Sequence, residues 1–499
     1  MSSLSHGHST VSRDYDVIIV GAGVLGAALG ATLGRQGRRT LVLERDLRVP
    51  DRIVGELLQP GGYRALQALG LQECTEDIDA IPCYGYHIQS ATKQTVAIQY
   101  PVVEPASMAE KKPRYQGRSF HHGRFVDKLR QACHHTPNVT MVEATVNKLL
   151  RCPVTQRVIG IQCYSKIATD ETAQPSEQDR QYYQYYAPLT IIADGCFSKF
   201  RRECGASMPQ NVSHFCGFIL RDCTLPTPHH GHVLLTPSAP ILMYQIGTHE
   251  TRILVDIPGK LPSIGNGDMK KYLLKHIAPH LPSSVTTSFH KALETERFRV
   301  MPNSRLPGHL TQEDGVLVLG DALNMRHPLT GAGMTVALND VLLLRSLLSP
   351  AAIPDLWDDM AMRQCKLALH TGRKSYACVL NVLAHGIYTI FAADPQDPQM
   401  KVMQLGCFNY FRLGEQWVDG PVGLLGGIYH SQWLLLGHFY SVAMYGLWLI
   451  LSGRAASIDA RPSFVACLLA LPMNLVRCAI TLWAASWLLL PAMLAEFLA

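Results

Sequence analysis

Residues 16–26, DVIIVGAGVLG, join a short β-branched run to a closely spaced set of glycines. The run at 16–20 predicts a buried strand of a parallel sheet. We expect an Ala/Leu/Gly-rich helix as far as about Gly37, and then a second strand at 40–43 that ends at Glu44. Three glycines allow a tight turn, a close approach to a pyrophosphate and tight helix–strand packing, namely Gly21, Gly23 and Gly26. Strand, glycines, helix, strand and acid in this order predict a dinucleotide-binding α/β fold.

Two features give this fold its expected chemistry. The N-terminus of the predicted helix offers backbone N–H groups and a positive dipole to phosphates. Glu44, eighteen residues after Gly26, is placed to accept hydrogen bonds from ribose hydroxyls. The alternative is a glycine-rich turn packed in a core, which the order of the elements disfavours. The glycine pattern alone does not separate NAD from FAD.

A second region, some 300 residues downstream, makes that separation. Residues 315–319 predict another buried strand, which leads into Gly320-Asp321. Residues 328–334 then enter a helix expected to end near Leu348. Asp321 is suited to hold ribityl hydroxyls, and the glycine-bounded helix start can approach an isoalloxazine ring. For Asp321 alone the alternative is a helix-capping residue, but the two regions together predict FAD.

The overall composition excludes several classes of protein. The chain has 499 residues, 47% hydrophobic and 17% charged, so it is neither disordered nor an ordinary highly charged soluble protein. The net charge of +6 is not concentrated in a basic tract, so we expect no nucleic-acid partner. The 14 cysteines are scattered without a CxxC pair, which favours reduced thiols. No metal site is predicted, because HExxH spacing is absent and His121 and His122, expected on a strand, would point to opposite faces.

Charged residues become rare at the C-terminal end of the chain. Between 420 and 499 there are five, namely Arg454, Asp459, Arg461, Arg477 and Glu496. Two apolar runs, at 434–451 and 464–499, flank a polar connector at 453–462. A helix needs about 20 apolar residues to cross a bilayer, and Arg477 is costly in lipid. We therefore expect a helical hairpin that enters or lies along one leaflet, with a buried helix pair in a soluble core as the alternative.

Four longer stretches carry a family resemblance: 51–62 (DRIVGELLQPGG), 120–125 (FHHGRF), 194–201 (DGCFSKFR) and 320–331 (GDALNMRHPLTG). With the glycine pattern, they resemble the FAD-dependent monooxygenases of the p-hydroxybenzoate hydroxylase superfold. More narrowly, the chain resembles the squalene monooxygenase (squalene epoxidase) family over nearly its whole length. The resemblance implies an α/β fold: a Rossmann-like FAD-binding domain, an antiparallel-sheet substrate domain and a C-terminal helical, membrane-associated region.

The expected domain boundaries follow from this arrangement. We expect a discontinuous FAD-binding domain at 14–82, 115–203 and 296–348, a substrate domain at 83–114 and 204–295, and the helical region at 349–499. Within them, residues 165–187 are interpreted as a hairpin insertion and residues 104–112 as a solvated loop.

The resemblance also implies site residues. Beyond the three glycines, the family's FAD contacts map onto Val24, Leu25, Glu44, Arg45, Arg52, Arg130, Val146, Asp321 and Met334. A catalytic pair near the reacting flavin maps onto Tyr86 and Gln59, with a hydrogen bond between them. Surface salt bridges are the alternative for Arg52 and Arg130, and a core tyrosine on a strand is the alternative for Tyr86.

The implied activity is epoxidation of squalene to (S)-2,3-epoxysqualene by O2, through a flavin C4a-hydroperoxide, in ergosterol-type sterol biosynthesis. The resemblance implies that NADPH is the indirect electron donor, through NADPH-cytochrome P450 reductase. The sequence itself contains no second complete GxGxxG. The expected location is the endoplasmic reticulum membrane, with the catalytic domain facing the cytosol and the C-terminal hairpin in the bilayer. Since the chain begins shortly before its first strand, we expect attachment to depend on that hairpin.

Three other functions are considered. A prenyl-chain reductase of the same superfold would hydrogenate alkenes, and its product would form without oxygen. A prenyl-binding escort protein would keep the architecture without flavin, against which Glu44, Arg52 and Asp321 argue. A soluble aromatic hydroxylase is disfavoured by the apolar C-terminal region.

Overall fold

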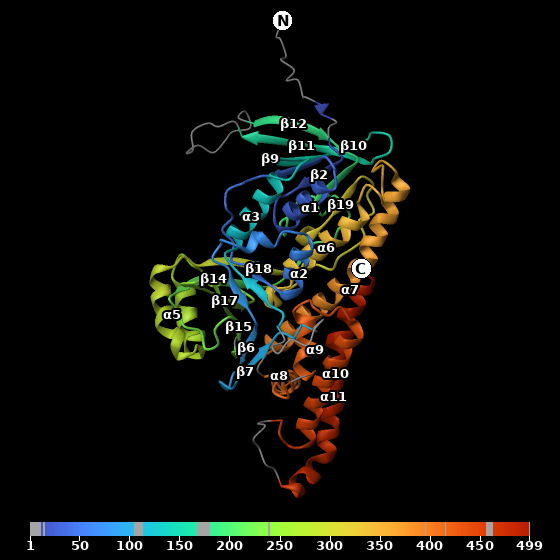
Figure 1. Cartoon of the computed structure of the whole chain (residues 1–499). Coiled ribbons are helices and arrows are strands. Elements are labelled where there is room, and N and C mark those ends of the chain that lie inside the picture. The colour runs from blue at the N-terminus through green and yellow to red at the C-terminus, as the bar shows by residue number, and fades with distance from the viewer. Residues whose placement is uncertain are drawn as a thin grey trace.

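A parallel sheet, built from segments far apart in the sequence, lies at the centre of one half of the body (Figure 1). The computed structural model describes residues 11–12, 15–103, 113–166, 180–237, 240–394, 396–414, 416–455 and 463–498. The five strands, in the order β19-β13-β2-β3-β9, are β2 (Val17–Val20), β3 (Thr40–Glu44), β9 (Val139–Glu143), β13 (Leu189–Ile192) and β19 (Val316–Val318). All four neighbouring pairs run parallel. Because β2 and β13 are buried along their whole length, their runs of β-branched and aliphatic residues show no polar alternation.

Helices cover one face of this sheet. The packed group contains α1 (Val24–Arg35), α2 (Pro60–Ala68), α3 (His122–His134) and α6 (Gly333–Leu347), beside the 3-10 turn η1 (Gln72–Thr75). The predicted strand–helix–strand unit is confirmed, but α1 ends at Arg35 rather than near Gly37. Gly37 has a φ of +86°, a left-handed conformation that glycine adopts without strain and that turns the chain toward β3.

The other face is covered by a four-stranded sheet of order β1-β12-β11-β10. Its strands are β1 (Val11–Ser12), β10 (Thr145–Arg151), β11 (Val158–Lys166) and β12 (Arg180–Tyr186). β11 and β12 are antiparallel, as expected for a hairpin, although its middle, 167–179, lies outside the described residues. The loop predicted at 104–112 also lies outside them.

A larger sheet builds the second half of the body, with the strand order β18-β14-β17-β16-β15-β6-β7. Its strands are β6 (Gly85–Gln89), β7 (Thr95–Gln99), β14 (Gln210–Arg221), β15 (His230–Leu234), β16 (Ile241–Gly247), β17 (Glu250–Pro258) and β18 (Arg299–Arg305). All its pairings are antiparallel except β15 with β6. One face packs on α4 (Asp268–His276), η3 (Ala278–His280) and α5 (Ser283–Thr295) through Leu273 and Phe289.

Short elements connect these layers. The small sheet β4-β8-β5 contains β4 (Leu57–Leu58), β5 (Ile81–Cys83) and β8 (Gly117–Ser119). Two 3-10 turns, η4 (Gly320–Ala322) and η5 (Pro328–Thr330), lie between β19 and α6. The expectation that His121 and His122 lie on a strand is wrong: His121 caps α3 and His122 is its first residue.

The C-terminal helices form an elongated arm (Figure 1). They are α7 (Asp359–Phe391), α8 (Pro398–Phe411), α9 (Gln416–Leu425), α10 (Gln432–Leu451) and α11 (Phe464–Leu498). α10 and α11 pack together as the predicted hairpin, and α11 is helical past both Pro472 and Pro491. Both are long and apolar enough to cross a membrane, with mean hydropathies of 1.6 and 1.9. Only 17% of the most apolar part of α11 is buried, which argues against a helix pair hidden in a core.

Candidate active site

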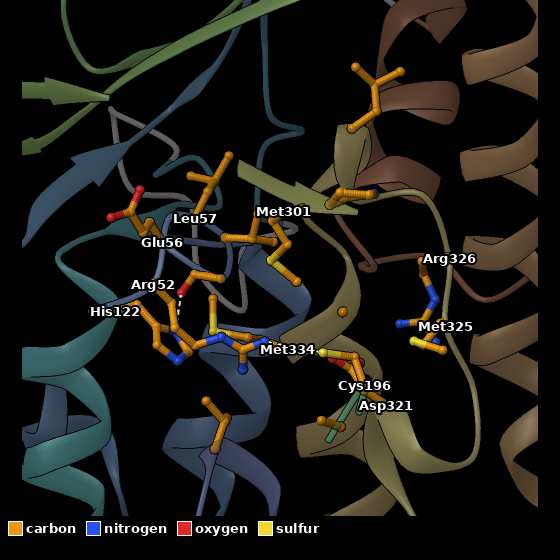
Figure 2. Close-up of a pocket in the computed structure, with 18 of the residues that line it drawn as sticks. Arg52, Glu56, Leu57, His122, Cys196, Met301, Asp321, Met325, Arg326 and Met334 are labelled. Atoms are coloured by element: carbon orange, nitrogen blue, oxygen red, sulfur yellow. Dashed lines mark hydrogen bonds between the residues drawn. The ribbon is translucent and has the colours of Figure 1, made fainter. Parts of the chain in front are cut away.

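A cavity lies where the carboxyl ends of three parallel strands face the seven-stranded sheet (Figure 2). Gly23 follows β2, Gly195 follows β13 and Asp321 follows β19, while Gly231 and Leu254 come from the opposing sheet. Ligands of open α/β sheets bind at these strand ends, because the connecting loops and helix N-termini converge there.

The glycine turn after β2 is held too tightly for larger residues. A Cβ on Gly21 would lie 2.5 Å from the carbonyl oxygen of Ala193, and a Cβ on Gly26 would lie 1.9 Å from that of Gly21. Gly21 also has a φ of +105°. At Gly23, by contrast, an added Cβ would meet no atom within 4 Å. The first and third glycines therefore serve packing, and the second leaves open the approach to the N-terminus of α1.

Two predicted residues brace this turn. Glu44 Oε2 accepts a hydrogen bond from the Ala22 amide at 2.8 Å, and Arg130 Nε donates to the Ala22 carbonyl at 2.9 Å. Arg130 and Glu44 also form an ion pair at 3.4 Å. The suggestion that Arg130 forms only a surface salt bridge is wrong, because the residue is 7% exposed.

Five other predicted residues line the cavity, namely Val24, Leu25, Arg52, Asp321 and Met334. Figure 2 shows Arg52 extending toward Cys196, to whose Sγ its guanidinium donates a hydrogen bond at 3.4 Å. Asp321 lies at the same end of the cavity, and its backbone carbonyl accepts from Arg201 at 2.9 Å. Arg45 is exposed, and Val146 is 5% exposed in the core behind the parallel sheet; neither lines the cavity.

The predicted pair Tyr86 and Gln59 meets beside this cavity. The Tyr86 hydroxyl donates to Gln59 Oε1 at 2.8 Å, and Gln59 Nε2 donates to the Thr330 carbonyl at 2.7 Å. A second phenol, Tyr100, donates to the same Oε1 at 2.6 Å. Burial raises the pKa of Tyr86 and of Tyr100, so both phenols stay protonated at neutral pH. With three hydrogen bonds, the Gln59 amide is fixed in one orientation.

The chain is similar to known proteins over nearly its whole length. The family model for squalene epoxidase matches residues 186–461. The chain is 47% identical to the squalene epoxidase erg1 of Aspergillus fumigatus over 495 residues, which covers 99% of this chain and 95% of that protein. It is 43% identical to the squalene monooxygenase of Mus musculus, covering 90% of this chain and 74% of that one. The chain belongs to the squalene epoxidase family.

A solved structure shares the fold of this squalene epoxidase family member. PqsL, a probable FAD-dependent monooxygenase from Pseudomonas aeruginosa, superposes with a TM-score of 0.59 and 19% identity. The match covers 76% of this chain and 97% of PqsL.

Sequence reasoning missed several charged or titratable residues of the cavity wall, among them Glu56, His122, His232 and Arg326. His122 lines the cavity, and its Nδ1 lies 2.9 Å from the Gly55 carbonyl (Figure 2). Burial lowers the pKa of His122 to about 4, so it is neutral at pH 7 and donates this hydrogen bond from Nδ1. Glu56 also lines the cavity and forms a buried bidentate pair with Arg252, both distances being 2.8 Å. Glu56 and His122 both lie in the sequence stretches that carry the family resemblance, but nothing in the spacing of those stretches shows that the two side chains face the cavity.

A second cavity lies among the C-terminal helices and shares part of its wall with the first. Tyr86, Val233 and Leu329 line both cavities. The rest of the second wall is almost entirely apolar and comes from β6, β7 and α7 to α11, as in Ile88, Ile98, Ile387, Phe391, Phe411, Leu425, Phe439 and Leu489. Within the described residues, no group of three or more His, Cys, Asp or Glu side chains could hold a metal ion.

Proposed function

We propose that this chain is an FAD-dependent squalene monooxygenase that forms (S)-2,3-epoxysqualene with O2 and NADPH-derived electrons, a step of ergosterol-type sterol biosynthesis. Family membership supports the reaction and the cofactor. The observation that carries the proposal is the junction at Tyr86, where a cavity with dinucleotide-binding elements meets an apolar cavity suited to a long hydrocarbon.

The residues present fit FAD. The open approach at Gly23 and the N-terminus of α1 suit the pyrophosphate, with Arg52 as a neighbouring cation. The Asp321 carboxylate suits ribityl hydroxyls, and Leu25 and Met334 offer apolar surface to the rings. Glu44 and Arg130 would act by bracing the turn. That Arg45 and Val146 also contact FAD stays a prediction.

Bound FAD, once reduced, supplies the activation of O2 and the transfer of one oxygen atom to an alkene. The protein's own contribution is orientation and dryness. Gln59 accepts the proton of the Tyr86 hydroxyl at the junction of the cavities, and Tyr100 donates to the same amide oxygen. A terminal alkene that reaches this junction would lie next to the flavin cavity, while the apolar wall keeps the remaining chain out of water. Tyr86 and Gln59 are therefore proposed as the catalytic pair.

A membrane-associated helical arm explains how an insoluble substrate reaches the enzyme. Large apolar side chains cover the outer surface of α10 and α11, with Trp433 83% exposed and Trp483 and Trp487 each 69% exposed. Aromatic residues of this kind favour the interface of a bilayer. We propose attachment to the endoplasmic reticulum membrane through this arm, with the body facing the cytosol and NADPH-cytochrome P450 reductase as electron partner.

The decisive experiment uses detergent-purified full-length protein with squalene, NADPH and the reductase. We expect a flavin absorbance spectrum and formation of 2,3-epoxysqualene in air but not under nitrogen. Label from ¹⁸O2 should appear in the epoxide. A saturated product that forms without oxygen would favour a prenyl-chain reductase. Folded, colourless protein that binds squalene would favour an escort protein and would contradict the proposal.

A further inference from the structure

Arg326 lies on the wall of the first cavity, in the segment between η4 and η5 (Figure 2). Its guanidinium Nε donates to Asn381 Oδ1 and its NH2 group to Asn324 Oδ1, both at 2.5 Å. Burial lowers the pKa of Arg326 to about 10, which leaves it charged at neutral pH. The described contacts include no carboxylate within salt-bridge distance of this arginine. Two asparagine amides therefore orient it, together with a longer hydrogen bond of 3.5 Å to the Ala332 carbonyl.

The Asn381 amide orients Arg326 correctly in only one of its two flips. Its Oδ1 must face the guanidinium, because the opposite flip would bring an NH2 donor against five N–H donors. Its Nδ2 donates to Glu496 Oε2 at 2.7 Å and to Asn324 Oδ1 at 3.2 Å. An acceptor at position 496 therefore fixes the flip that turns Oδ1 toward Arg326.

Glu496 belongs to the last turn of α11, 170 positions after Arg326 in the sequence. Although most of α11 is exposed, Glu496 is only 9% exposed, and Lys374 of α7 donates to the neighbouring Phe497 carbonyl at 2.7 Å. Figure 1 shows the end of α11 returning from the tip of the arm to lie beside α7. The apolar arm is thus connected to the first cavity by polar contacts at its very end.

We propose that Glu496 is a positioning residue, which holds the Arg326 guanidinium on the wall of the flavin cavity through Asn381 and so couples the end of α11 to cofactor retention. This inference rests on the proposed function only in that FAD occupies the first cavity. Because coupling free energies are reciprocal, bound FAD also stabilises the docked end of α11.

The test is the rate at which FAD leaves the detergent-purified holoenzyme, followed as flavin remaining on the protein after repeated desalting. Glu496→Leu removes the acceptor, and we expect release on the order of tenfold faster. Glu496→Gln keeps an acceptor oxygen without the charge and should release FAD at nearly the wild-type rate. Leu494→Ala, in the same turn and 57% exposed, is the matched control and should leave the rate unchanged.

Two outcomes distinguish positioning from other roles. If Glu496 acted only as a charge, Gln and Leu would behave alike, and removing a carboxylate would slow release of the anionic cofactor. If it only supported folding, Glu496→Leu would have the same effect in an Asn381→Ala background, whereas positioning predicts almost no added effect there. Either result overturns the inference.

The inference can also be tested on the wild-type chain alone. Bound FAD should slow hydrogen exchange of the backbone amides at 490–498. Equal exchange with and without FAD would also overturn the inference. Failure of the wild-type chain to bind any flavin would instead contradict the proposed function.

Discussion

The two cavities that meet at Tyr86 differ in almost every respect except their shared boundary. The first has arginines, acids, an imidazole and a helix N-terminus on its wall, supplied by loops at strand ends. The second has almost only aliphatic and aromatic side chains, supplied by helix faces and two strands. The first is therefore suited to bind a charged cofactor through a few directed contacts, and the second to hold a hydrocarbon through area alone. The site thus combines a cavity that can recognise a ligand by directed polar contacts with one that can recognise it only by apolar contact and shape.

The strongest test of the first cavity is Asp321→Ala. We expect the purified variant to carry almost no flavin, because it loses the cavity carboxylate that we propose as the partner of the ribityl hydroxyls. Flavin content is measured from the absorbance of the protein after gel filtration. Asp314→Asn, at the opposite end of the same strand, is the control and should stay yellow. A fully yellow Asp321→Ala protein would remove Asp321 from the site.

The proposed membrane attachment, through which a hydrocarbon would reach the apolar cavity, is tested on α11. Replacing both Trp483 and Trp487 by Glu places two charges on its exposed apolar surface. We expect binding to vesicles of neutral lipid to fall at least about tenfold, since charged groups are costly at this depth. Flotation of the purified variant measures the loss. Val154→Glu, 87% exposed in the turn between β10 and β11, should float like the wild type. Unchanged flotation of the double variant would place the anchor elsewhere.

Tyr86→Phe tests the boundary itself. We expect FAD to stay bound while epoxide formation falls on the order of tenfold to a hundredfold, because the hydrogen bond between the Tyr86 hydroxyl and Gln59 at the junction is lost. The comparison of flavin content with turnover checks this. Tyr84→Phe, two residues earlier and 38% exposed, should be active. Full activity of Tyr86→Phe would mean that the tyrosine is only a wall between the cavities.

The smallest expected effect concerns pH and His122. The folded protein lowers the pKa of His122 from 6.5 to about 4 through burial. Between these values the unfolded chain binds a proton that the folded chain does not, so stability is complete above pH 6.5 and falls as pH decreases toward 4. His122→Asn should reduce the loss of unfolding free energy between pH 7 and pH 5.5 by about 1 kcal/mol. Urea unfolding measures it, with exposed His134→Asn as control. If the dependence of the unfolding free energy on pH were the same in His122→Asn as in the wild type, burial in the cavity wall would not lower the pKa of His122.

The sequence predicted the polar half of the site far better than the apolar half. Strand ends and glycine turns have local patterns, so Gly21, Glu44 and Asp321 could be identified from their neighbours in the chain. Tyr86 and Gln59 came from family resemblance, because no spacing rule joins them. Tyr100 could have been found from the β6–β7 register: Ile98 lies opposite Tyr86, and side chains two residues apart share a face of a strand.

The remaining parts depend on contacts between distant segments. The apolar cavity is assembled from five helices, and any one of its leucines looks like an ordinary core residue in the sequence. The sequence wrongly predicts a strand at His122, because the N-cap of α3 is His121, which makes no side-chain capping hydrogen bond and is not a typical helix-start residue. Glu496 and Asn381 meet across 115 residues, a separation at which sequence pattern carries no information on pairing.

The central claim is that the apolar cavity holds the substrate of the flavin cavity, and Gly386→Phe tests it most directly. Gly386 lies on α7 at the cavity wall, where a Cβ would keep ordinary distances of 3.6 Å to Leu488 and 3.9 Å to Phe439. A phenyl ring there would take up space at the wall of the apolar cavity. We predict unchanged flavin content and a KM for squalene raised at least about tenfold, whereas the same change at exposed Gly437 leaves KM unaltered. A Gly386→Phe enzyme that is folded and keeps the wild-type KM would contradict the account.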